Sequence, residues 1–256
     1  MRHSKIGIAC TKKDTSIVSK LESAHWPHIV NMKKLQPGYE ESRKHFFPID
    51  TIDVCSHIRV NIYPDGGIAR IRVYGEVQPK IDENFPCTSL IDLISLENGG
   101  TVVEYSNAHF GHPRNLIKPE RGINMGDGWE TMRRLDRPAI LEVDSRGILK
   151  VPGCEWTTLR MCCFGSVSEI VVDTNHFKGN FADSVRIVGT ILHKNETLRS
   201  ARWTTILPSQ KLAPHKEHFY KAEIVNCGPF EYIRIIMAPD GGISRVRIFG
   251  YKEESF

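Results

Sequence analysis

The sequence lacks the patterns that mark several large classes of protein. It has no Walker A loop, no GxGxxG, no GxSxG elbow and no HExxH motif, so nucleotide binding and the common serine or zinc hydrolase chemistries have no support. Its seven cysteines form no CxxC pair, and the net charge is only +4 with no dense Lys/Arg block. We therefore predict reduced thiols and no nucleic-acid partner.

Long apolar runs are also missing. No stretch approaches the ~20 apolar residues that a membrane helix needs, so we expect no membrane partner. The first residues, "MRHSKIGIACTKK", do not form a convincing signal peptide, and the last three, Glu-Ser-Phe, are not a peroxisomal SKL-type signal. These features lead us to predict a cytoplasmic location.

Helical periodicity is sparse, and short β-branched segments take its place. They read "TVVEYS", "TTLRMCCF", "EIVVDT" and "SVRIVGTIL", with Gly, Asn, Asp or Pro between them. Segments of this length and composition, separated by turn residues, predict an all-β chain built as a β-sandwich or jelly roll.

One eighteen-residue pattern occurs twice, 175 residues apart: "IRVNIYPDGGIARIRVYG" from Ile58 and "IRIIMAPDGGISRVRIFG" from Ile233. Ten of the eighteen positions are identical, and a period this long indicates a duplicated domain rather than a solenoid. Each copy alternates apolar residues with arginines around Pro-Asp-Gly-Gly. We therefore predict a β-hairpin in each copy, with its arginines facing outward.

The two copies differ in what precedes them. If the second domain starts near Ile91, it has about 148 residues before its Pro239, whereas the first has 63 before Pro64. We therefore predict a first repeat at residues 1–80 that is shortened at its N-terminal side, a linker at 81–90 and a complete second repeat at 91–256. The apolar faces left by such a shortening predict that 1–80 is poorly ordered or self-associating in isolation, while the second repeat folds alone.

The densest group of polar side chains lies in residues 106–134, "SNAHFGHPRNLIKPERGINMGDGWETMRR". Gly126-Asp127-Gly128 predicts a turn that presents a carboxylate and a tryptophan on a loop, and loops on a rigid sandwich often carry function. The structural alternative is a surface turn in which Trp129 plugs the end of the sandwich.

A second group follows a predicted strand in "VVDTNHFKGN", residues 171–180. Asp173 and His176 have the chemistry of an acid/base pair or of metal ligands, although such a spacing more often belongs to a hydrogen-bonded strand end. His109 and His112 could complete a metal site, but no spacing among these four residues is diagnostic. The sequence thus implies no definite cofactor and leaves a divalent metal open.

Four stretches together resemble the allantoicase family: "MGDGWETMRR", "FGHPRNLI", "VVDTNHFKGN" and the doubled "PDGGI" segment. The resemblance covers nearly the whole chain. It implies two repeats of a jelly-roll sandwich related to galactose-binding or discoidin domains, of which the first is incomplete here. It also implies hydrolysis of allantoate to ureidoglycolate and urea in purine degradation, and assembly into a homo-oligomer. The chain departs from the family in carrying Asp-Gly-Trp-Glu only once.

The chemistry of that reaction assigns roles to ten residues of the second repeat. Asp127 and Glu130 are the acid/base candidates, and His109 and His176 are orienting or proton-relay residues. Arg133 or Arg134 would bind the substrate carboxylate, and Trp129 would stack against a ureido group. Asn107, Asn180 and Asp173 complete the predicted substrate-binding set. The alternative is a catalytically inactive β-sandwich that binds a ligand or serves assembly, because fold alone does not decide function.

Overall fold

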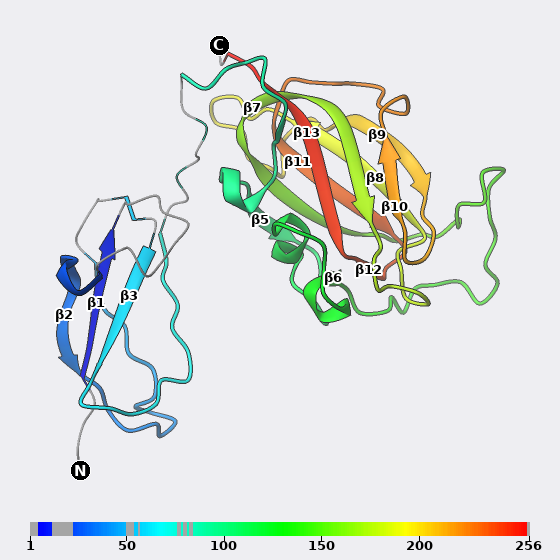
Figure 1. Cartoon of the computed structure of the whole chain (residues 1–256). Helices are drawn as coiled ribbons and strands as arrows, with labels where there is room; N and C mark the ends of the chain where they lie inside the picture. Colours follow the sequence, from blue (N-terminus) through cyan, green and yellow to red (C-terminus); the bar gives the residue numbers. More distant parts are fainter. Residues whose placement is uncertain are drawn as a thin grey trace. The chain divides into compact units, whose positions relative to one another are not determined.

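The chain divides into two compact units, residues 1–76 and 77–256, in a computed structural model of the full sequence (Figure 1). The structure describes residues 5–11, 23–49, 54–55, 57–75, 78, 81 and 84–254; part of the predicted linker, residues 82–83, lies outside them. Among these residues the regular elements are antiparallel strands and 3-10 turns of three to five residues. The predicted all-β class is confirmed.

Unit 1 contains a three-stranded antiparallel sheet in the order β2-β1-β3. Its strands are β1 (Lys5–Thr11), β2 (His28–Lys34) and β3 (His57–Tyr63), and a 3-10 turn, η2 (Ser23–His25), precedes β2. Val30 is its buried centre, and partly buried side chains such as Phe47 and Val60 pack around it. This core is small for an independent domain.

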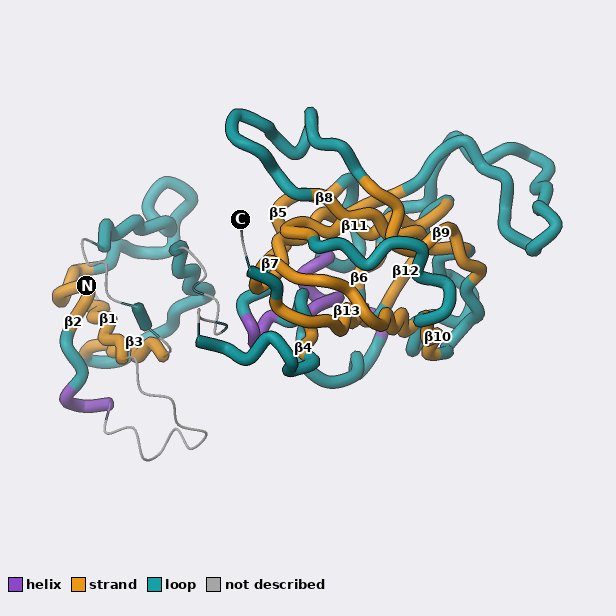
Figure 2. Tube along the Cα trace, turned by 90° about the horizontal axis from the view of Figure 1, so that it is seen from above, coloured by secondary structure: helices purple, strands orange, loops and turns teal. Residues whose placement is uncertain are grey.

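Unit 2 contains eight strands in one connected sheet. They are β4 (Ile91–Asp92), β5 (Thr101–Tyr105), β7 (Glu155–Asp173), β8 (Ser184–Thr190), β9 (Thr204–Lys211), β10 (Glu217–Tyr220), β11 (Phe230–Ala238) and β13 (Arg245–Lys252). The main order is β4-β13-β7-β11-β8-β9, with β5 and β10 also paired to β7. The 3-10 turns η3 (Leu96–Asn98), η4 (Pro113–Ile117) and η5 (Met125–Asp127) lie in the connections, and Figure 2 shows how strands and long loops dominate this unit.

The nineteen-residue strand β7 belongs to both layers of the sandwich. Its first part pairs with β5 and β11, and its second part pairs with β13 and β10. Gly165 lies at the change of partners, where a Cβ atom would come within 2.6 Å of the Tyr251 carbonyl oxygen. The predicted strands "TTLRMCCF" and "EIVVDT" are therefore one continuous strand that turns at a glycine.

The repeated Pro-Asp-Gly-Gly segment does not make a hairpin in either copy, so that prediction is wrong. In the second copy, β11 and β13 lie on opposite sides of β7 instead of pairing with each other. In the first copy, β3 ends at Tyr63 and residues 64–75 form no strand. Alternation identifies a half-buried strand, but it carries no information about the neighbouring strand.

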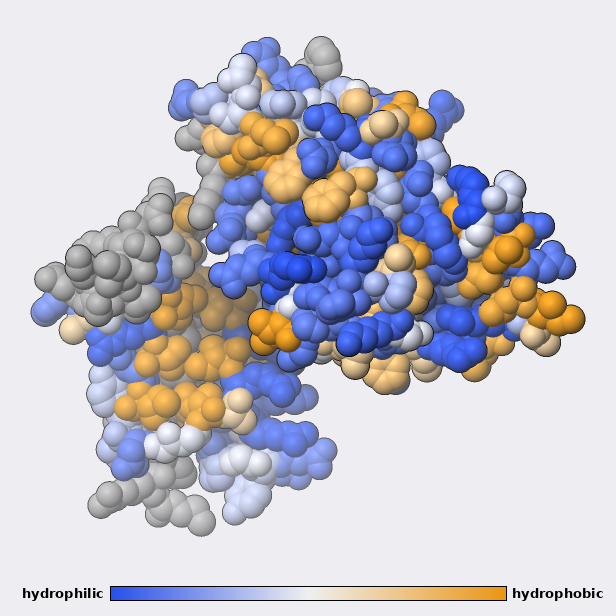
Figure 3. Space-filling model, turned by 45° about the vertical axis from the view of Figure 1, so that its right-hand side comes forward, coloured by the Kyte–Doolittle hydropathy of each residue, from blue (hydrophilic) through white to orange (hydrophobic). Residues whose placement is uncertain are grey.

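The core of unit 2 fills the space between the two layers. Alternate residues of β11 (Ile233, Ile235 and Met237) are fully buried and meet Val246 and Ile248 of β13 in one cluster. The 24-residue segment between β6 (Trp129–Glu130) and β7 projects from the sandwich (Figure 1) and exposes Leu135 and Ile140. On the face seen in Figure 3, apolar side chains gather in separate groups among hydrophilic ones. No helix formed by the described residues has the length and apolar character of a membrane span.

Candidate functional site

The Pro-Asp-Gly-Gly segment of the second copy organises one end of unit 2. It links β11 in one layer to β13 in the other and contains the short strand β12 (Gly242–Ile243), which pairs with β6. The Thr131 amide donates to the Gly241 carbonyl over 3.0 Å, and the Gly242 amide donates to the Asn180 carbonyl over 2.8 Å. Gly241 has φ of +125°, and a Cβ atom there would lie 2.8 Å from the Asn180 carbonyl oxygen. Three stretches that are distant in sequence thus meet at a backbone crossing that only glycine fits.

Trp129 anchors this end of the molecule from inside. Its side chain is fully buried in the hydrophobic core, and its indole nitrogen donates to the Asn107 carbonyl over 2.9 Å. This is the placement expected of a residue that plugs the sandwich, and no face of the ring is open to a ligand. Because strand residues alternate, the buried Trp129 and Thr131 leave Glu130 on the opposite side.

Four of the predicted residues form one polar group around Glu130. The side-chain amide of Asn180 donates to Glu130 Oε1 over 2.5 Å. The Glu130 carbonyl accepts hydrogen bonds from the amides of Phe110 and Gly111, the residues that follow His109. The Asn107 side-chain oxygen accepts from the His109 amide at 2.9 Å and from the Met132 amide at 3.2 Å. Loop 107–111, β6 and the β7–β8 loop are therefore joined at one place.

His109 is the open side chain of this group. It is exposed, its ring contacts Phe110 edge-on at 4.5 Å, and within the described part of the chain its ring nitrogens make no hydrogen bond or ion pair. Both ring nitrogens are therefore available to a ligand.

The two candidate arginines differ in how far they are already paired. Arg134 lies 2.7 Å from Asp136 and 3.0 Å from Glu155, and these carboxylates raise its pKa further, Asp136 most. Arg133 is exposed and has no hydrogen bond or ion pair to any described residue. Both line a cavity of about 330 Å³ together with Asn107 and Glu155. Arg133 is thus the arginine that is free to bind a carboxylate.

Asp127 has a different environment from Glu130. It accepts from Lys118 Nζ at 2.6 Å and from Arg245 Nη2 at 2.7 Å, while its backbone carbonyl accepts from Arg245 Nη1. Partial burial works to raise its pKa, but the hydrogen bonds from Lys118 and Arg245 prevail and lower it to about 2. Asp127 therefore stays ionised at neutral pH, which suits an ion pair and does not suit a proton donor.

Asp173 is the last residue of β7 and His176 lies in the β7–β8 connection, and both contact the loop that carries Arg121 and Gly122. Asp173 is buried and accepts two hydrogen bonds from Arg121, at 3.0 and 3.2 Å. His176 Nε2 lies 2.9 Å from the Gly122 carbonyl, and its backbone amide donates to His215 Nδ1. Asp127, Asp173 and His176 are thus held by Arg245, Arg121 and the Gly122 carbonyl, apart from the hydrogen bonds that join the Glu130 group.

The described residues offer no three His, Cys, Asp or Glu side chains placed together as metal ligands. In particular, His112 Nδ1 caps η4 by accepting from the Arg114 amide at 3.0 Å, and Asp173 is occupied by Arg121.

Sequence reasoning missed the ionic residues that support these groups. Asp240 of the Pro-Asp-Gly-Gly segment forms a bidentate pair with Arg137 and accepts from the Arg134 amide at 2.9 Å. Arg245, predicted to face outward, is only 4% exposed and bonds to Asp127. That prediction is wrong. The alternation of apolar and polar residues distinguishes the two faces of a strand, but it does not show whether a loop covers the polar face. The sequence did contain a signal for these residues, because the Asp and the Arg at the positions of Asp240 and Arg245 occur in both copies of the repeated motif.

Comparison of the sequence and the structure with known proteins identifies one family. A family model described as the allantoicase repeat matches residues 2–78 and 91–253. A "Probable allantoicase" of Acinetobacter baumannii strain SDF is 42% identical over 236 residues, and one of strain ATCC 17978 is 42% identical over 234. These matches cover 91% and 90% of this chain but 64% and 63% of the relatives, so the chain spans less than two thirds of their length.

Solved structures give the same result. The crystal structure of allantoicase from Saccharomyces cerevisiae superposes with a TM-score of 0.72 at 28% identity, covering 96% of this chain and 68% of that one. A second structure described as allantoicase gives a TM-score of 0.72 at 31% identity, with the same coverage.

Proposed function

Because this chain belongs to the allantoicase family, we propose that it hydrolyses allantoate to ureidoglycolate and urea, the reaction of purine degradation for which the family is named. The observation that carries the proposal is the contact of Asn180 with Glu130. This contact joins the Asp-Gly-Trp-Glu and Asp-Thr-x-x-Phe-x-Gly-Asn stretches beside loop 107–111. The same junction leaves the second oxygen of Glu130 and the ring of His109 without a hydrogen bond to a described residue, and Arg133 lines a cavity beside Asn107.

The reaction breaks one carbon–nitrogen bond at an sp³ carbon that bears a carboxylate and two ureido groups. A proton must reach the leaving nitrogen, because urea leaves poorly as an anion. The oxygen of water must bond to the same carbon, either directly or after the remaining ureido nitrogen has expelled urea. Water thus supplies the hydroxyl of ureidoglycolate and, in sum, the proton that urea gains.

Each step can be assigned to a residue of the Glu130 group. Arg133 binds the substrate carboxylate with its unpaired guanidinium. Glu130, oriented by Asn180, takes a proton from water or from the remaining ureido nitrogen through its second carboxylate oxygen. His109 carries a proton to the leaving nitrogen, and the Asn107 amide orients a ureido end. Asp127, Asp173 and His176 act as positioning residues that hold the loops around this group.

A urea-release assay on the 256-residue chain tests the proposal. Wild-type protein, Glu130→Gln and the exposed control Arg199→Gln are compared on allantoate, and the Acinetobacter relative serves as the longer reference. The proposal predicts release by wild type and Arg199→Gln and a loss of about 10²–10⁴-fold in Glu130→Gln. A folded wild-type chain that binds allantoate but releases no urea would instead support the inactive binding module. We also propose the cytoplasm as the compartment and a homo-oligomer as the assembly.

A further inference from the structure

A second cavity, of about 310 Å³, lies at the far end of unit 2 from the site described above. Its floor includes Phe230, the first residue of β11, whereas Asp240 lies two residues beyond the last residue of that strand. Nine strand residues span about 26 Å between their first and last Cα atoms. A ligand in this cavity would therefore not touch the Glu130 group.

The floor of the cavity is fixed by close packing. Phe230 is 4% exposed, and Gly189 and Gly228 lie against its ring. A Cβ atom on either glycine would come within 2.7 Å of that ring, and Gly228 also has φ of +102°. Both positions therefore require glycine, and the apolar floor is formed before any ligand arrives.

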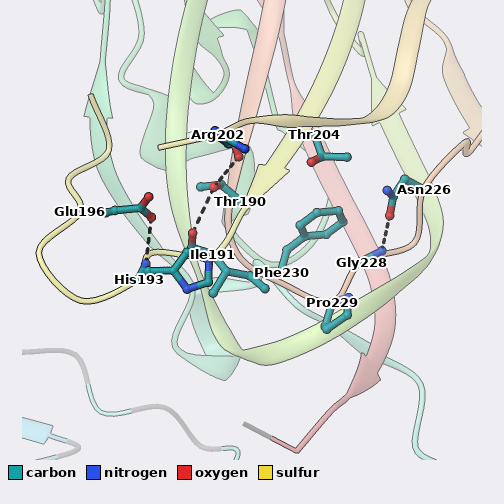
Figure 4. Close-up of a pocket in the computed structure, with 10 residues that line it drawn as sticks. All are labelled: Thr190, Ile191, His193, Glu196, Arg202, Thr204, Asn226, Gly228, Pro229 and Phe230. Carbon is teal, nitrogen blue, oxygen red and sulfur yellow. Dashed lines mark hydrogen bonds between the residues drawn. The ribbon is translucent and has the colours of Figure 1, made fainter. Parts of the chain in front are cut away.

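The walls are held by hydrogen bonds that leave other polar atoms free (Figure 4). Thr190 Oγ1 donates to the Arg202 carbonyl over 2.8 Å, which joins the two ends of the loop between β8 and β9. The His193 amide donates to Glu196 Oε2 at 3.0 Å, which holds a turn within the first part of this loop. On the opposite wall, Asn226 Oδ1 accepts from the Gly228 amide at 2.9 Å. These bonds occupy main-chain atoms, the Thr190 hydroxyl, one carboxylate oxygen of Glu196 and the side-chain oxygen of Asn226.

The remaining polar atoms have a definite chemistry. The guanidinium of Arg202, the ring of His193 and the Asn226 side-chain NH₂ make no hydrogen bond to a described residue. They offer donors to an anion, and the second oxygen of Glu196 offers an acceptor. Residues 191–202 carry three basic side chains, Lys194, Arg199 and Arg202, against the single acidic Glu196. The surroundings therefore favour a negatively charged ligand.

We propose that this cavity binds a small organic carboxylate that also carries N–H donors, as an amino acid or a ureido acid does. Arg202 binds the carboxylate, Glu196 accepts from the N–H group, and Phe230 supports the apolar part of the ligand. Its volume lies at the lower limit for small-molecule sites, which fits a molecule of this size. The site is separate from the one proposed for hydrolysis and does not depend on it.

Backbone amide NMR of the deuterated full chain, titrated with N-carbamoylglycine, tests the proposal. We expect the resonances of Thr204, Asn226 and Gly228 to shift saturably, with acetate at equal concentration giving weaker binding. Arg202→Gln should weaken this binding at least about tenfold, since hydrogen bonds to charged groups are the strong ones. The matched variant Arg199→Gln should bind like wild type. Glu196→Gln should weaken the binding of N-carbamoylglycine more than the binding of acetate, because acetate has no N–H group to donate to Glu196.

The Arg133→Gln variant separates this cavity from the site at the other end. Shifts at Asn226 and Gly228 should persist in it, whether or not the chain hydrolyses allantoate. The proposal is overturned if those resonances do not move in the wild type, or if Arg202→Gln retains the full response. It is also overturned if Arg202→Gln abolishes urea release from allantoate in the absence of N-carbamoylglycine. The cavity would then be the reaction site itself.

Discussion

The side-chain amide of Asn180 donates a hydrogen bond of 2.5 Å to the carboxylate of Glu130. The two residues are fifty positions apart, Glu130 in β6 and Asn180 in the β7–β8 loop, and Gly242 of the Pro-Asp-Gly-Gly segment pairs with both. The bond fixes one carboxylate oxygen and leaves the other for chemistry.

Asn180→Ala should lower kcat about 10- to 100-fold while KM changes little. Asn180 acts through Glu130, and a misplaced base loses much of its advantage in proton transfer. Steady-state kinetics of urea release measure the effect. If Asn180 were merely structural, the variant would lose thermal stability while its kcat per folded molecule stayed at the wild-type value.

Arg133→Gln should raise KM for allantoate by about tenfold or more, because it removes the unpaired cation that binds the carboxylate. Arg134→Gln should act mainly on stability, since Arg134 is held by Asp136 and Glu155. Kinetics and thermal melting of both variants distinguish the two effects. The assignment fails if Arg134→Gln raises KM and Arg133→Gln does not.

Asp127→Asn should destabilise unit 2 by about 2–4 kcal/mol at pH 7, because the nearly buried Arg245 would lose its carboxylate partner. The folded-state pKa of Asp127 is about 2, below its ordinary value of 3.8. Its contribution to stability is therefore complete above about pH 4 and is lost as the pH falls through 2. Urea unfolding from pH 7 to pH 2 should show a difference between wild type and variant that shrinks with acid. A difference that is constant over this range would contradict the pairing.

Asp92 should show the opposite pH dependence. Burial raises its pKa to about 6, despite hydrogen bonds from the Ile94 and Ile248 amides and the nearby Arg247. The protonated form is thus favoured in the folded state, and the associated stability is complete below about pH 4 and lost as the pH rises through 6. Asp92→Asn should therefore gain stability relative to wild type between pH 4 and pH 7. Unfolding at both pH values checks the sign, and an unchanged difference would refute it.

Residues 77–256 expressed alone should fold cooperatively, whereas residues 1–76 alone should aggregate or stay unfolded. Unit 2 has a continuous core of more than twenty buried residues, while Val30 is the buried centre of the small cluster described in unit 1. Circular dichroism melting and limited proteolysis of the two fragments measure this. A cooperative melt of 1–76 as a soluble monomer would count against it.

Local chemistry was enough to predict much of this protein. Short β-branched segments predicted strands at β5, β7 and β8 because burial between layers requires such side chains. The repeated eighteen residues indicated duplication, and the Asp-Gly-Trp-Glu region held the residues that surround Glu130. Each of these inferences depends only on residues close together in sequence.

Pairing partners and charge compensation needed the tertiary structure. The sequence could not show that β7 separates β11 from β13, since the alternation of apolar and polar residues does not identify the strand that lies next to a given strand. Nor could it show that Arg134 is already paired while the adjacent Arg133 is open, or that Arg245 neutralises Asp127 across 118 residues. The sequence alone determined the strand segments, the duplication and the family, because these reside in local pattern. Only folding decided that Glu130 rather than Asp127, and Arg133 rather than Arg134, stays available to a ligand. The reason is that their ionic partners come from distant parts of the chain.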